Sequence, residues 1–305
     1  MSAEGLMSKE QTSSGEFVRQ EDEFRGDILP DDTESGRYHL YVSLACPWAH
    51  RTLIFRKLLG LEETISASEV DPIRDNRGWR FGKGNGFQPD PINGFSYLSE
   101  AYMATNPSFT GRVTVPVLWD KKRKAIVNNS EDDICYIFQR RFAAADAMDY
   151  FPQGLAQEQA ELSEFIYERI NNGVYKAGFA TTQTAYEKAV SSLFEALEII
   201  EDRLSRQKFL LGNEIVETDW RLFCTLLRFD PVYFGHFKCN LKRIVDYPNM
   251  QRFLKELCLY PGIIETVNMD HIKRHYYMTH EDINPTKIVP IGPLSDIETL
   301  GTKGT

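Results

Sequence analysis

Apolar positions in the first half of the chain follow the spacings of strands and helices in turn. Residues 38–43 alternate as a half-buried strand does, and residues 47–59 carry apolar side chains three and four positions apart, as on one face of a helix. A second strand pattern covers residues 64–70. Two short strands joined by a basic turn follow at residues 115–127, and a helical pattern covers residues 132–142. These elements predict a mixed α/β unit.

Their order is strand, helix, strand, and then strand, strand, helix. With a cysteine where the first helix begins, this is the thioredoxin-like arrangement, and it predicts an α/β N-terminal domain over residues 37–146. Residues 71–111 connect the two parts and are rich in glycine, proline, asparagine and aromatic residues. Connections of this length usually carry function, so we expect part of a site there.

The second half of the chain shows helical periods and no strand pattern. Helical spacings recur in four stretches, at residues 157–171, 183–204, 219–227 and 249–258. We therefore expect an all-α second domain over residues 153–281. The polar first 36 residues predict a loosely held arm, and the proline-containing residues 282–305 predict an extension along the surface.

Composition narrows the class of protein. The chain has 305 residues, of which 42% are hydrophobic and 26% charged, and its net charge of −9 is not that of a nucleic-acid-binding surface. No apolar run reaches the roughly 18 residues of a membrane span, and the acidic N-terminal segment argues against a secretory signal. The five cysteines are scattered and odd in number, so we expect neither a zinc cluster nor a disulfide framework. These features favour a cytoplasmic enzyme without a metal.

Cys46 is the residue most suited to chemistry. Pro47 fits the first position of a helix, because its ring fixes a helical φ and its missing N–H is not needed there. Cys46 is then the N-cap, where the free N–H groups and the positive end of the helix favour a thiolate. Such placement lowers a cysteine pKa from about 8.5 to roughly 3.5–7.5. We expect His50 and Arg51 to add positive charge, and we interpret Cys46 as a nucleophile.

A buried, inert cysteine is the alternative, since most unpaired cysteines are structural. The Cys46–Pro47 pair at a strand-to-helix turn favours reactivity instead. A two-cysteine oxidoreductase would need a second thiol three residues on, where this chain has Ala49. Any disulfide chemistry must therefore use one protein thiol and one thiol from outside.

Several longer motifs closely resemble the xi-class glutathione transferases, the glutathionyl-hydroquinone reductases. The matches span about residues 38–293 and are far more specific than the Cys-Pro pair, which omega-class transferases share. The matching segments are Cys46-Pro47-Trp48-Ala49-His50-Arg51, Gly78-Trp79, the stretch 111–120, Asn172-Gly173-Val174-Tyr175-Lys176, the stretch 228–233, His275-Tyr276-Tyr277 and Ile283-Asn284-Pro285.

The resemblance implies the soluble glutathione transferase architecture and a reaction. In that family the cysteine thiolate attacks the sulfur of a glutathionyl-hydroquinone, the hydroquinone leaves, and the enzyme keeps a mixed disulfide with glutathione. A second glutathione, the co-substrate, then releases oxidised glutathione. One reactive cysteine with no resolving partner agrees with this sequence of steps.

Roles for other residues also follow from the resemblance. It implies that Trp79 and Arg112 bind glutathione, and that Val115, before a cis Pro116, pairs its backbone with the cysteinyl part of glutathione. Simple packing of the long connection is the alternative for Trp79. The resemblance also implies that three tyrosines line the hydroquinone pocket and offer it ring contacts and hydroxyl donors. They are Tyr175, Tyr233 and Tyr276. Without the resemblance each would be an ordinary boundary tyrosine, and Tyr277 is expected to face elsewhere.

The chain departs from the family at two places. Relatives carry a Glu-Ser pair that holds the two ends of the γ-glutamyl group, whereas this chain has Ser130-Glu131, followed by two further acidic residues. Either Glu131 still binds the ligand ammonium after a shift of one position, or glutathione binding is altered. Val216 replaces a threonine N-cap, which should cost about 1 kcal/mol of stability.

Two other functions stay open from the sequence. An omega-like thioltransferase or dehydroascorbate reductase would use the same Cys46 chemistry, but the three tyrosines and the segment 275–285 favour the hydroquinone reaction. A non-catalytic ligand-binding homologue would explain the altered residues 130–131, but intact Cys46 argues against it. The resemblance also implies a homodimer formed through the helical domain near residues 236–241.

Overall fold

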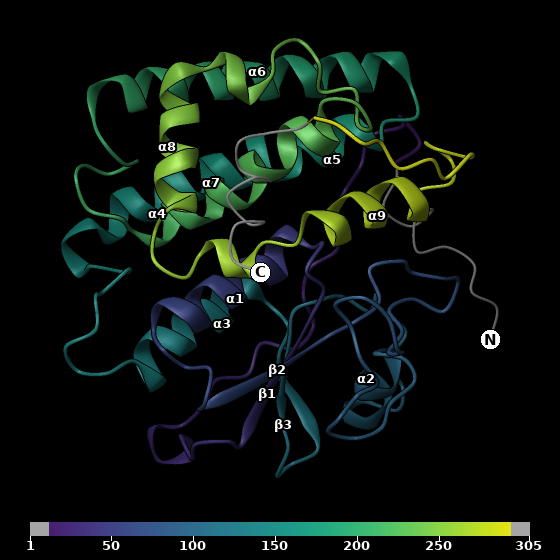
Figure 1. Ribbon diagram of the computed structural model, residues 1–305, viewed down its shortest axis with the longest axis vertical. Coiled ribbons are helices and arrows are strands. Elements are labelled where there is room, and N and C mark those ends of the chain that lie inside the picture. Colours follow the sequence, from purple (N-terminus) through teal and green to yellow (C-terminus); the bar gives the residue numbers. More distant parts are fainter. Residues whose placement is uncertain (1–11, 294–305) are drawn as a thin grey trace. The chain divides into compact units, whose positions relative to one another are not determined.

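The computed structural model describes residues 12–293, which fold as two compact units (Figure 1). The first unit contains residues 21–148 and 265–279. The second contains residues 12–20, 149–264 and 280–293. The two units thus interleave along the chain at both ends.

A four-stranded sheet forms the centre of the first unit. Its strands are β1 (Tyr38–Val42), β2 (Ile65–Glu69), β3 (Val117–Asp120) and β4 (Ala125–Asn128). They lie in the order β2-β1-β3-β4, with β1 parallel to β2 and β3 antiparallel to both of its neighbours. A parallel pair needs a crossover connection, and α1 (Pro47–Leu58) supplies it. The predicted thioredoxin-like α/β fold is confirmed.

Helices α1 and α3 (Glu131–Ile137) lie side by side (Figure 1), and α3 continues into a π-helical turn, η3 (Phe138–Phe142). The prediction of one buried face on α1 is wrong. Ala49 and Ile54 are buried as expected, but so are His50 and Arg51. Polar residues can be buried here because each has a partner inside the unit, as described below.

Two helices of the first unit were not evident from the sequence. The connection 71–111 contains α2 (Ser99–Thr105), which packs beside β4, where the hydroxyl of Thr105 accepts a hydrogen bond from the backbone N–H of Ile126 at 2.8 Å. Near the other end of the chain, α9 (Met269–Thr279) belongs to the unit of the sheet. The domain boundaries at residues 146 and 281 stay a prediction, because the compact units are not continuous in sequence.

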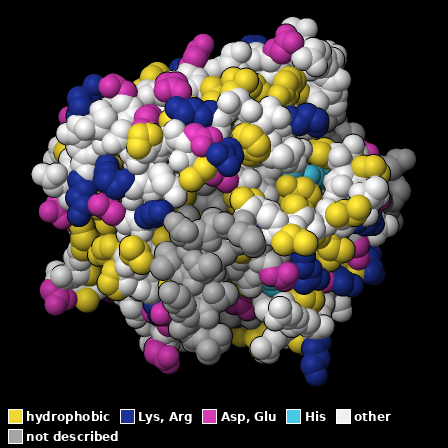
Figure 2. Space-filling model, turned by 45° about the horizontal axis from the view of Figure 1, so that its top comes forward, with side chains coloured by type: hydrophobic (Ala, Val, Ile, Leu, Met, Phe, Trp, Pro, Cys, Tyr) yellow, Lys and Arg dark blue, Asp and Glu magenta, His cyan; other side chains and the backbone are white. Residues whose placement is uncertain are grey.

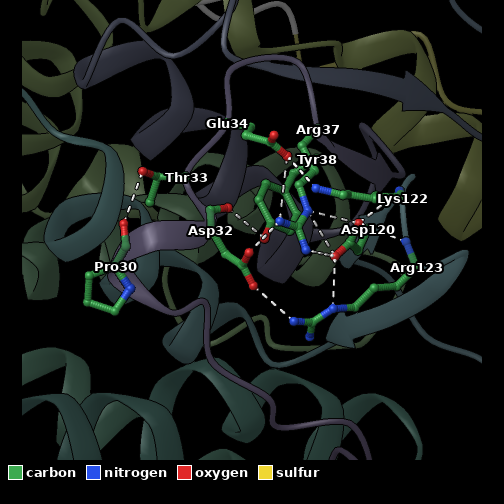
Figure 3. Close-up of polar contacts among 9 residues, drawn as sticks. All are labelled: Pro30, Asp32, Thr33, Glu34, Arg37, Tyr38, Asp120, Lys122 and Arg123. Atoms are coloured by element: carbon green, nitrogen blue, oxygen red, sulfur yellow. Dashed lines mark hydrogen bonds and ion pairs between the residues drawn. The ribbon is translucent and has the colours of Figure 1, made fainter.

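Arg37, directly before β1, fastens three segments of the first unit (Figure 3). Its guanidinium donates to Asp120 at the end of β3 and to Asp32 in the turn η2 (Pro30–Asp32), each at 2.7 Å. Burial alone would raise the pKa of Asp120, but hydrogen bonds from Arg37 and from the N–H groups of Lys122 and Arg123 outweigh it and hold that pKa below its usual range. The ion pair therefore fixes the β3–β4 hairpin to the start of β1.

Within its described residues the second unit contains helices and no β-strand, as predicted. Its α-helices are α4 (Ala156–Ile166), α5 (Asn172–Gly178), α6 (Gln183–Arg206), α7 (Glu217–Arg228) and α8 (Pro248–Cys258). Shorter helical turns are η4 (Gln153–Leu155), η5 (Tyr167–Asn171), η6 (Phe229–Tyr233) and η7 (Ile244–Asp246), while η8 (Ile264–Thr266) lies where the chain returns to the first unit. Helix α6 packs against α5 and α8, and α4 packs against α7 (Figure 1).

Local signals explain two helix starts in this unit. Thr182 caps α6, its hydroxyl accepting from the N–H of Ala185 at 3.3 Å. Val216 precedes α7 and has no side-chain oxygen for capping, but the carboxylate of Asp219 accepts from the N–H groups of Val216 and Leu210 at 2.8 and 2.9 Å. The half of the reciprocal capping arrangement in which the third helical residue accepts from the N-cap N–H is thus retained. Burial raises the pKa of Asp219 to about 7.

The predicted loose N-terminal arm is wrong for its described part. Phe17 is buried in the second unit. Further on, Phe24 and Asn129 exchange hydrogen bonds through the backbone and the amide side chain, each at 2.9 Å. The C-terminal extension is exposed from residue 285 to residue 288, and its last twelve residues lie outside the described part of the chain.

Within residues 12–293, no helix has the length and apolar character required to cross a bilayer. On the face drawn in Figure 2, basic and acidic side chains lie interspersed. This mixture agrees with the many ion pairs at the surface, such as Lys188 with Glu16 at 2.8 Å.

Replacing Arg37 should destabilise the protein strongly, because Asp120 would stay buried without its cation. We expect Arg37→Met to cost about 3 kcal/mol of unfolding free energy at neutral pH, measured by urea denaturation. The control is Arg123→Met, because the Arg123 side chain is 60% exposed and its ion pairs should contribute less than about 1 kcal/mol.

The pH dependence follows from the lowered pKa of Asp120 in the folded state. Its stabilising contribution is present above the unfolded carboxyl pKa of about 3.9 and is lost as the pH falls through the folded value. The difference between wild type and Arg37→Met should therefore shrink in acid. Equal costs for the two arginine variants would contradict this account of the ion pair.

Candidate active site

Cys46 lies where β1 gives way to α1, at the predicted N-cap. Its φ and ψ are −75° and 125°, Pro47 occupies the first helical turn, and the N–H of His50 donates to the carbonyl of Cys46 at 2.9 Å. Cys46 is partly exposed, whereas the other four cysteines of the chain are buried. The helix start therefore presents an accessible thiol beside the positive end of the helix.

The Cys46 thiol faces the loop before β3. Its Sγ donates to the carbonyl oxygen of Val115 at 3.7 Å, and the Val115–Pro116 bond is cis, as the resemblance implied. Helix α2 supports this loop, because the hydroxyl of Tyr102 donates to the carbonyl of Thr114 at 2.9 Å. Burial raises the pKa of Tyr102 to about 12, so this hydroxyl stays a donor. No local sequence pattern marks Tyr102, because its contact with Thr114 depends on the fold.

The start of α3 carries three consecutive acidic residues, which pair with two arginines from other segments. Arg51 of α1 donates to Glu131 at 2.9 Å and also bonds Asp132. Arg25 makes a two-pronged ion pair with Asp133, both distances being 2.6 Å. The positive charge expected from Arg51 near Cys46 is therefore matched by carboxylates, and that part of the prediction needs correction.

Ser130 is the N-cap of α3, and Glu131 is its first residue. Both side chains are buried, and Glu131 points to Arg51 of the neighbouring helix. The inverted pair thus places a hydroxyl group at the cap and a carboxylate within an ion pair. The glutathione-binding roles of these two residues stay a proposal.

Trp79 is buried in the long connection between two flat groups. The guanidinium of Arg74 lies 5.1 Å from the ring centroid, and the ring of His275 stacks on it at 5.1 Å with an interplanar angle of 20°. This arrangement agrees with the packing alternative and leaves a ligand contact untested. Arg112 is partly exposed and lies three residues before Val115.

Two histidines of α9 bond the backbone of the connection 71–111, a role that was not predicted from the sequence. The ring Nδ1 of His275 lies 2.6 Å from the carbonyl of Pro72, and the Nε2 of His271 lies 2.7 Å from that of Asn85. Their spacing of four residues, which puts both on one helix face, was the available signal. Tyr276 follows on α9, buried, with its ring 5.2 Å from that of His275.

His50, next to Cys46 in the motif, has a similar structural partner. Its Nε2 lies 2.8 Å from the hydroxyl of Thr266, and its side chain is buried. The segment before α9 is thereby joined to α1, inside the same unit. We infer that His50 positions α1 and is not an exposed source of charge.

Tyr175 and Tyr233 belong to the second unit, on α5 and η6. Their ring centroids are 5.9 Å apart, and the ring of Phe237 lies 5.4 and 5.5 Å from those of Tyr175 and Tyr233. Two of the three predicted tyrosines are thus neighbours. The convergence of this pair with Tyr276 and Cys46 stays a prediction.

These groups suit thiol chemistry. They supply an accessible sulfur at a helix start, a backbone carbonyl beside it, and phenol groups on other segments. Within residues 12–293, no cluster of histidine, cysteine or acidic side chains is suited to hold a metal ion.

Comparisons with known proteins agree with this chemistry. The family described as "Glutathione S-transferase, N-terminal domain" matches residues 45–141, and "Glutathione S-transferase, C-terminal domain" matches residues 183–256. The chain is 47% identical to the glutathionyl-hydroquinone reductase PcpF of Sphingobium chlorophenolicum, over 95% of this chain and 93% of that protein. It is 48% identical to the glutathionyl-hydroquinone reductase YqjG of Escherichia coli, over 94% and 92%.

The chain is also similar to solved structures of glutathione transferases. The glutathione transferase Xi of Phanerochaete chrysosporium superposes with a TM-score of 0.89 and is 45% identical, with 92% of this chain and 98% of that chain covered. The glutathione-bound structure of YqjG from Escherichia coli K-12 has a TM-score of 0.88 and 47% identity, with 90% and 94% covered.

Exchanging the inverted pair, as Ser130→Glu with Glu131→Ser, should tighten glutathione binding. The ligand ammonium would gain a carboxylate partner and the ligand carboxylate a hydroxyl donor, as the resemblance to relatives implies. Charged hydrogen bonds contribute roughly 1.5–3 kcal/mol each, so we expect an affinity at least about tenfold higher by calorimetry on a Cys46→Ser background.

The matched control for the exchange is Asp133→Asn, which changes a neighbouring charge that Arg25 already neutralises. Its glutathione affinity should stay within about twofold of the parent protein. If the exchanged protein binds no better than this control, Glu131 already holds the ammonium in its present position.

Proposed function

The chain belongs to the xi class of glutathione transferases, and on this premise we propose that it reduces glutathionyl-hydroquinones, with glutathione as co-substrate. Both PcpF and YqjG are glutathionyl-hydroquinone reductases, and each is nearly half identical to this chain over almost its whole length. The observation that carries the proposal is the accessible Cys46 thiol at the start of α1.

The reaction consists of two thiol exchanges at Cys46. In the first, the thiolate attacks the glutathionyl sulfur, the S–S bond of a mixed disulfide forms, and the carbon–sulfur bond breaks. The electron pair of that bond stays with the aromatic ring, which takes up a proton and leaves as the hydroquinone. In the second, a glutathione thiolate attacks the mixed disulfide and releases oxidised glutathione and the Cys46 thiolate. The aromatic ring gains two electrons, of which the glutathionyl sulfur of the substrate and the thiol sulfur of the second glutathione each lose one.

The residues of the first unit would hold the glutathionyl group. The backbone of Val115 would pair with its cysteinyl part, and Trp79, Arg112, Ser130 and Glu131 would contact the rest. The position of Val115, with its carbonyl 3.7 Å from the Cys46 sulfur, supports the first contact. A glutathione-bound structure of the relative YqjG supports glutathione as the ligand.

The tyrosines would bind the aromatic part of the substrate. Tyr175, Tyr233 and Tyr276 offer ring faces for a flat aromatic molecule and hydroxyl groups for its oxygens. Hydrogen bonds from these hydroxyls would stabilise negative charge on the departing hydroquinone. The adjacency of the Tyr175 and Tyr233 rings supports a shared role for these two.

The omega-like reductase activity is less well supported. It needs Cys46 but gives no role to the tyrosines, and two relatives that are 47% and 48% identical to this chain are glutathionyl-hydroquinone reductases. The non-catalytic alternative gives no reason for the exposed thiol at a helix start.

Assembly and location form the remainder of the proposal. We infer a homodimer through the helical unit near residues 236–241, because two-fold dimers are the commonest assemblies of soluble proteins and the resemblance implies this surface. A cytoplasmic location is supported by five scattered cysteines, four of them buried, which suits a reducing compartment.

Cys46 variants test the proposed reaction. Cys46→Ala should lower the reduction of a glutathionyl-hydroquinone by more than about a thousandfold, and Cys46→Ser should be little better, because a hydroxyl is hardly ionised near neutral pH. Mass spectrometry of the wild type treated with oxidised glutathione should find one glutathione on Cys46.

The substrate class is tested by assaying the wild type with a glutathionyl-hydroquinone and with hydroxyethyl disulfide in parallel. The control variant is Cys258→Ala, which removes a buried thiol of α8 and should keep the activity. Persistent activity in Cys46→Ala would contradict the mechanism, and turnover of the disulfide alone would favour the omega-like function.

A further inference from the structure

Residues 12–20 form an ordered strap on the helical unit. Gly15 accepts a hydrogen bond from the N–H of Thr181 at 3.1 Å, and Thr182 donates its hydroxyl to the carbonyl of Ser14 at 3.0 Å. Gly15 has a φ of +82°, and a Cβ there would lie 2.6 Å from the Thr181 hydroxyl, so only glycine fits. Phe17, 5% exposed, then turns inward against Phe179, with 5.5 Å between the ring centroids.

Arg19, two residues beyond Phe17, reaches the helix that carries Tyr175. Its Nε donates to the side-chain oxygen of Asn172 at 2.7 Å, and Asn172 is 4% exposed. Its guanidinium carbon lies 4.9 Å from the centroid of the Tyr175 ring and 5.4 Å from that of Phe17. Asn172 and Tyr175 are three residues apart on α5, so both lie on one face of the helix.

Two side chains of the strap, those of Arg19 and Phe17, pack against the Tyr175 ring. The planar guanidinium is held in place by Asn172 and covers the ring face, while the Phe17 ring lies at 6.4 Å and 29° to the Tyr175 ring. A cation over a phenol ring is an attractive contact, and its charge stabilises negative charge that develops on the phenol oxygen. The side chain of Arg19 is therefore suited both to orient Tyr175 and to strengthen the hydrogen bond that its hydroxyl donates.

We propose that Arg19 is a positioning residue of the hydroquinone reaction, acting through Tyr175. The proposal rests on the proposed function, since it is there that Tyr175 contacts the substrate. The strap is accordingly a part of the active enzyme, and removing it would impair the step at the aromatic ring while leaving the thiol exchange at Cys46 intact. A purely structural strap would affect both.

The first test compares Arg19→Gln with Val18→Ala, a change at an adjacent, 55% exposed position of the same strap. Arg19→Gln should lower kcat for a glutathionyl-hydroquinone about tenfold, about the effect of one charge-assisted contact, with KM nearly unchanged. Turnover of hydroxyethyl disulfide should stay within about twofold in both variants. Arg19→Lys keeps the charge but lacks the Nε donor and the flat face, and its activity should fall between wild type and Arg19→Gln.

A double variant distinguishes an effect of Arg19 through Tyr175 from a structural role of Arg19 alone. If Arg19 acts through the Tyr175 hydroxyl, Arg19→Gln should cause little further loss in a Tyr175→Phe protein. Multiplying losses in the double variant would overturn the proposal, as would equal kcat values for Arg19→Gln and Val18→Ala. Thermal unfolding of each variant shows whether a loss of activity comes from a loss of fold.

The last measurement does not depend on turnover. In NMR spectra of protein with labelled tyrosine rings, assigned with Tyr175→Phe, the Tyr175 ring should be restricted in wild type and Val18→Ala and more mobile in Arg19→Gln. An equally restricted ring in Arg19→Gln would overturn the proposal. A wild type with a restricted Tyr175 ring but no hydroquinone turnover would instead contradict the proposed function alone.

Discussion

The structure depends on the rigid junction at which β1 ends and α1 begins. Strand β1 lies inside the sheet, between β2 and β3, and its residues Leu40, Tyr41 and Val42 have no exposed surface. The first N–H groups of any helix lack partners within it, and Pro47 removes one of them. Cys46 is placed by this rigid junction and not by a flexible loop, which is the precision that a nucleophile requires.

Matched charges hold both ends of this strand. Before β1, Arg37 pairs with Asp120 inside the unit, and beyond its other end Arg51 of α1 pairs with Glu131 of α3. Truncating one member of a buried pair is costly, so the two arginines fix the hairpin and α3 relative to β1. Both arginines are thus engaged by carboxylates of their own unit.

The elements that could be predicted from the sequence are those that local patterns of residues determine. The strands of the sheet, the start of α1 and the long helices of the second half follow from alternation, Cys46–Pro47 and helical period. The sequence did not predict α9, because that helix is held by His271 and His275 through carbonyls of a connection about 200 positions earlier in the chain. The strap was missed for the same reason, since Arg19 and Asn172 are 153 residues apart.

In the candidate site, too, local motifs predicted some features, and others depend on contacts between distant segments. Cys46 and the cis Val115–Pro116 bond were found from the motif and its resemblance, and the structure confirms the N-cap and the cis bond. The ion pairs of the acidic start of α3 could not be foreseen, because Arg25 and Arg51 come from other segments. Charge in the sequence shows what must be neutralised, but only the fold shows by which residue.

The central claim is that the start of α1 makes Cys46 a stronger nucleophile than an ordinary cysteine. The direct measurement is the rate at which iodoacetamide alkylates Cys46, followed on its peptide by mass spectrometry from about pH 6 to about pH 8. The account predicts that the rate levels off within this range, because a helix start favours the thiolate at a lower pH than in an ordinary cysteine. A rate that rises about tenfold per pH unit, as for an ordinary cysteine with a pKa of about 8.5, would contradict it.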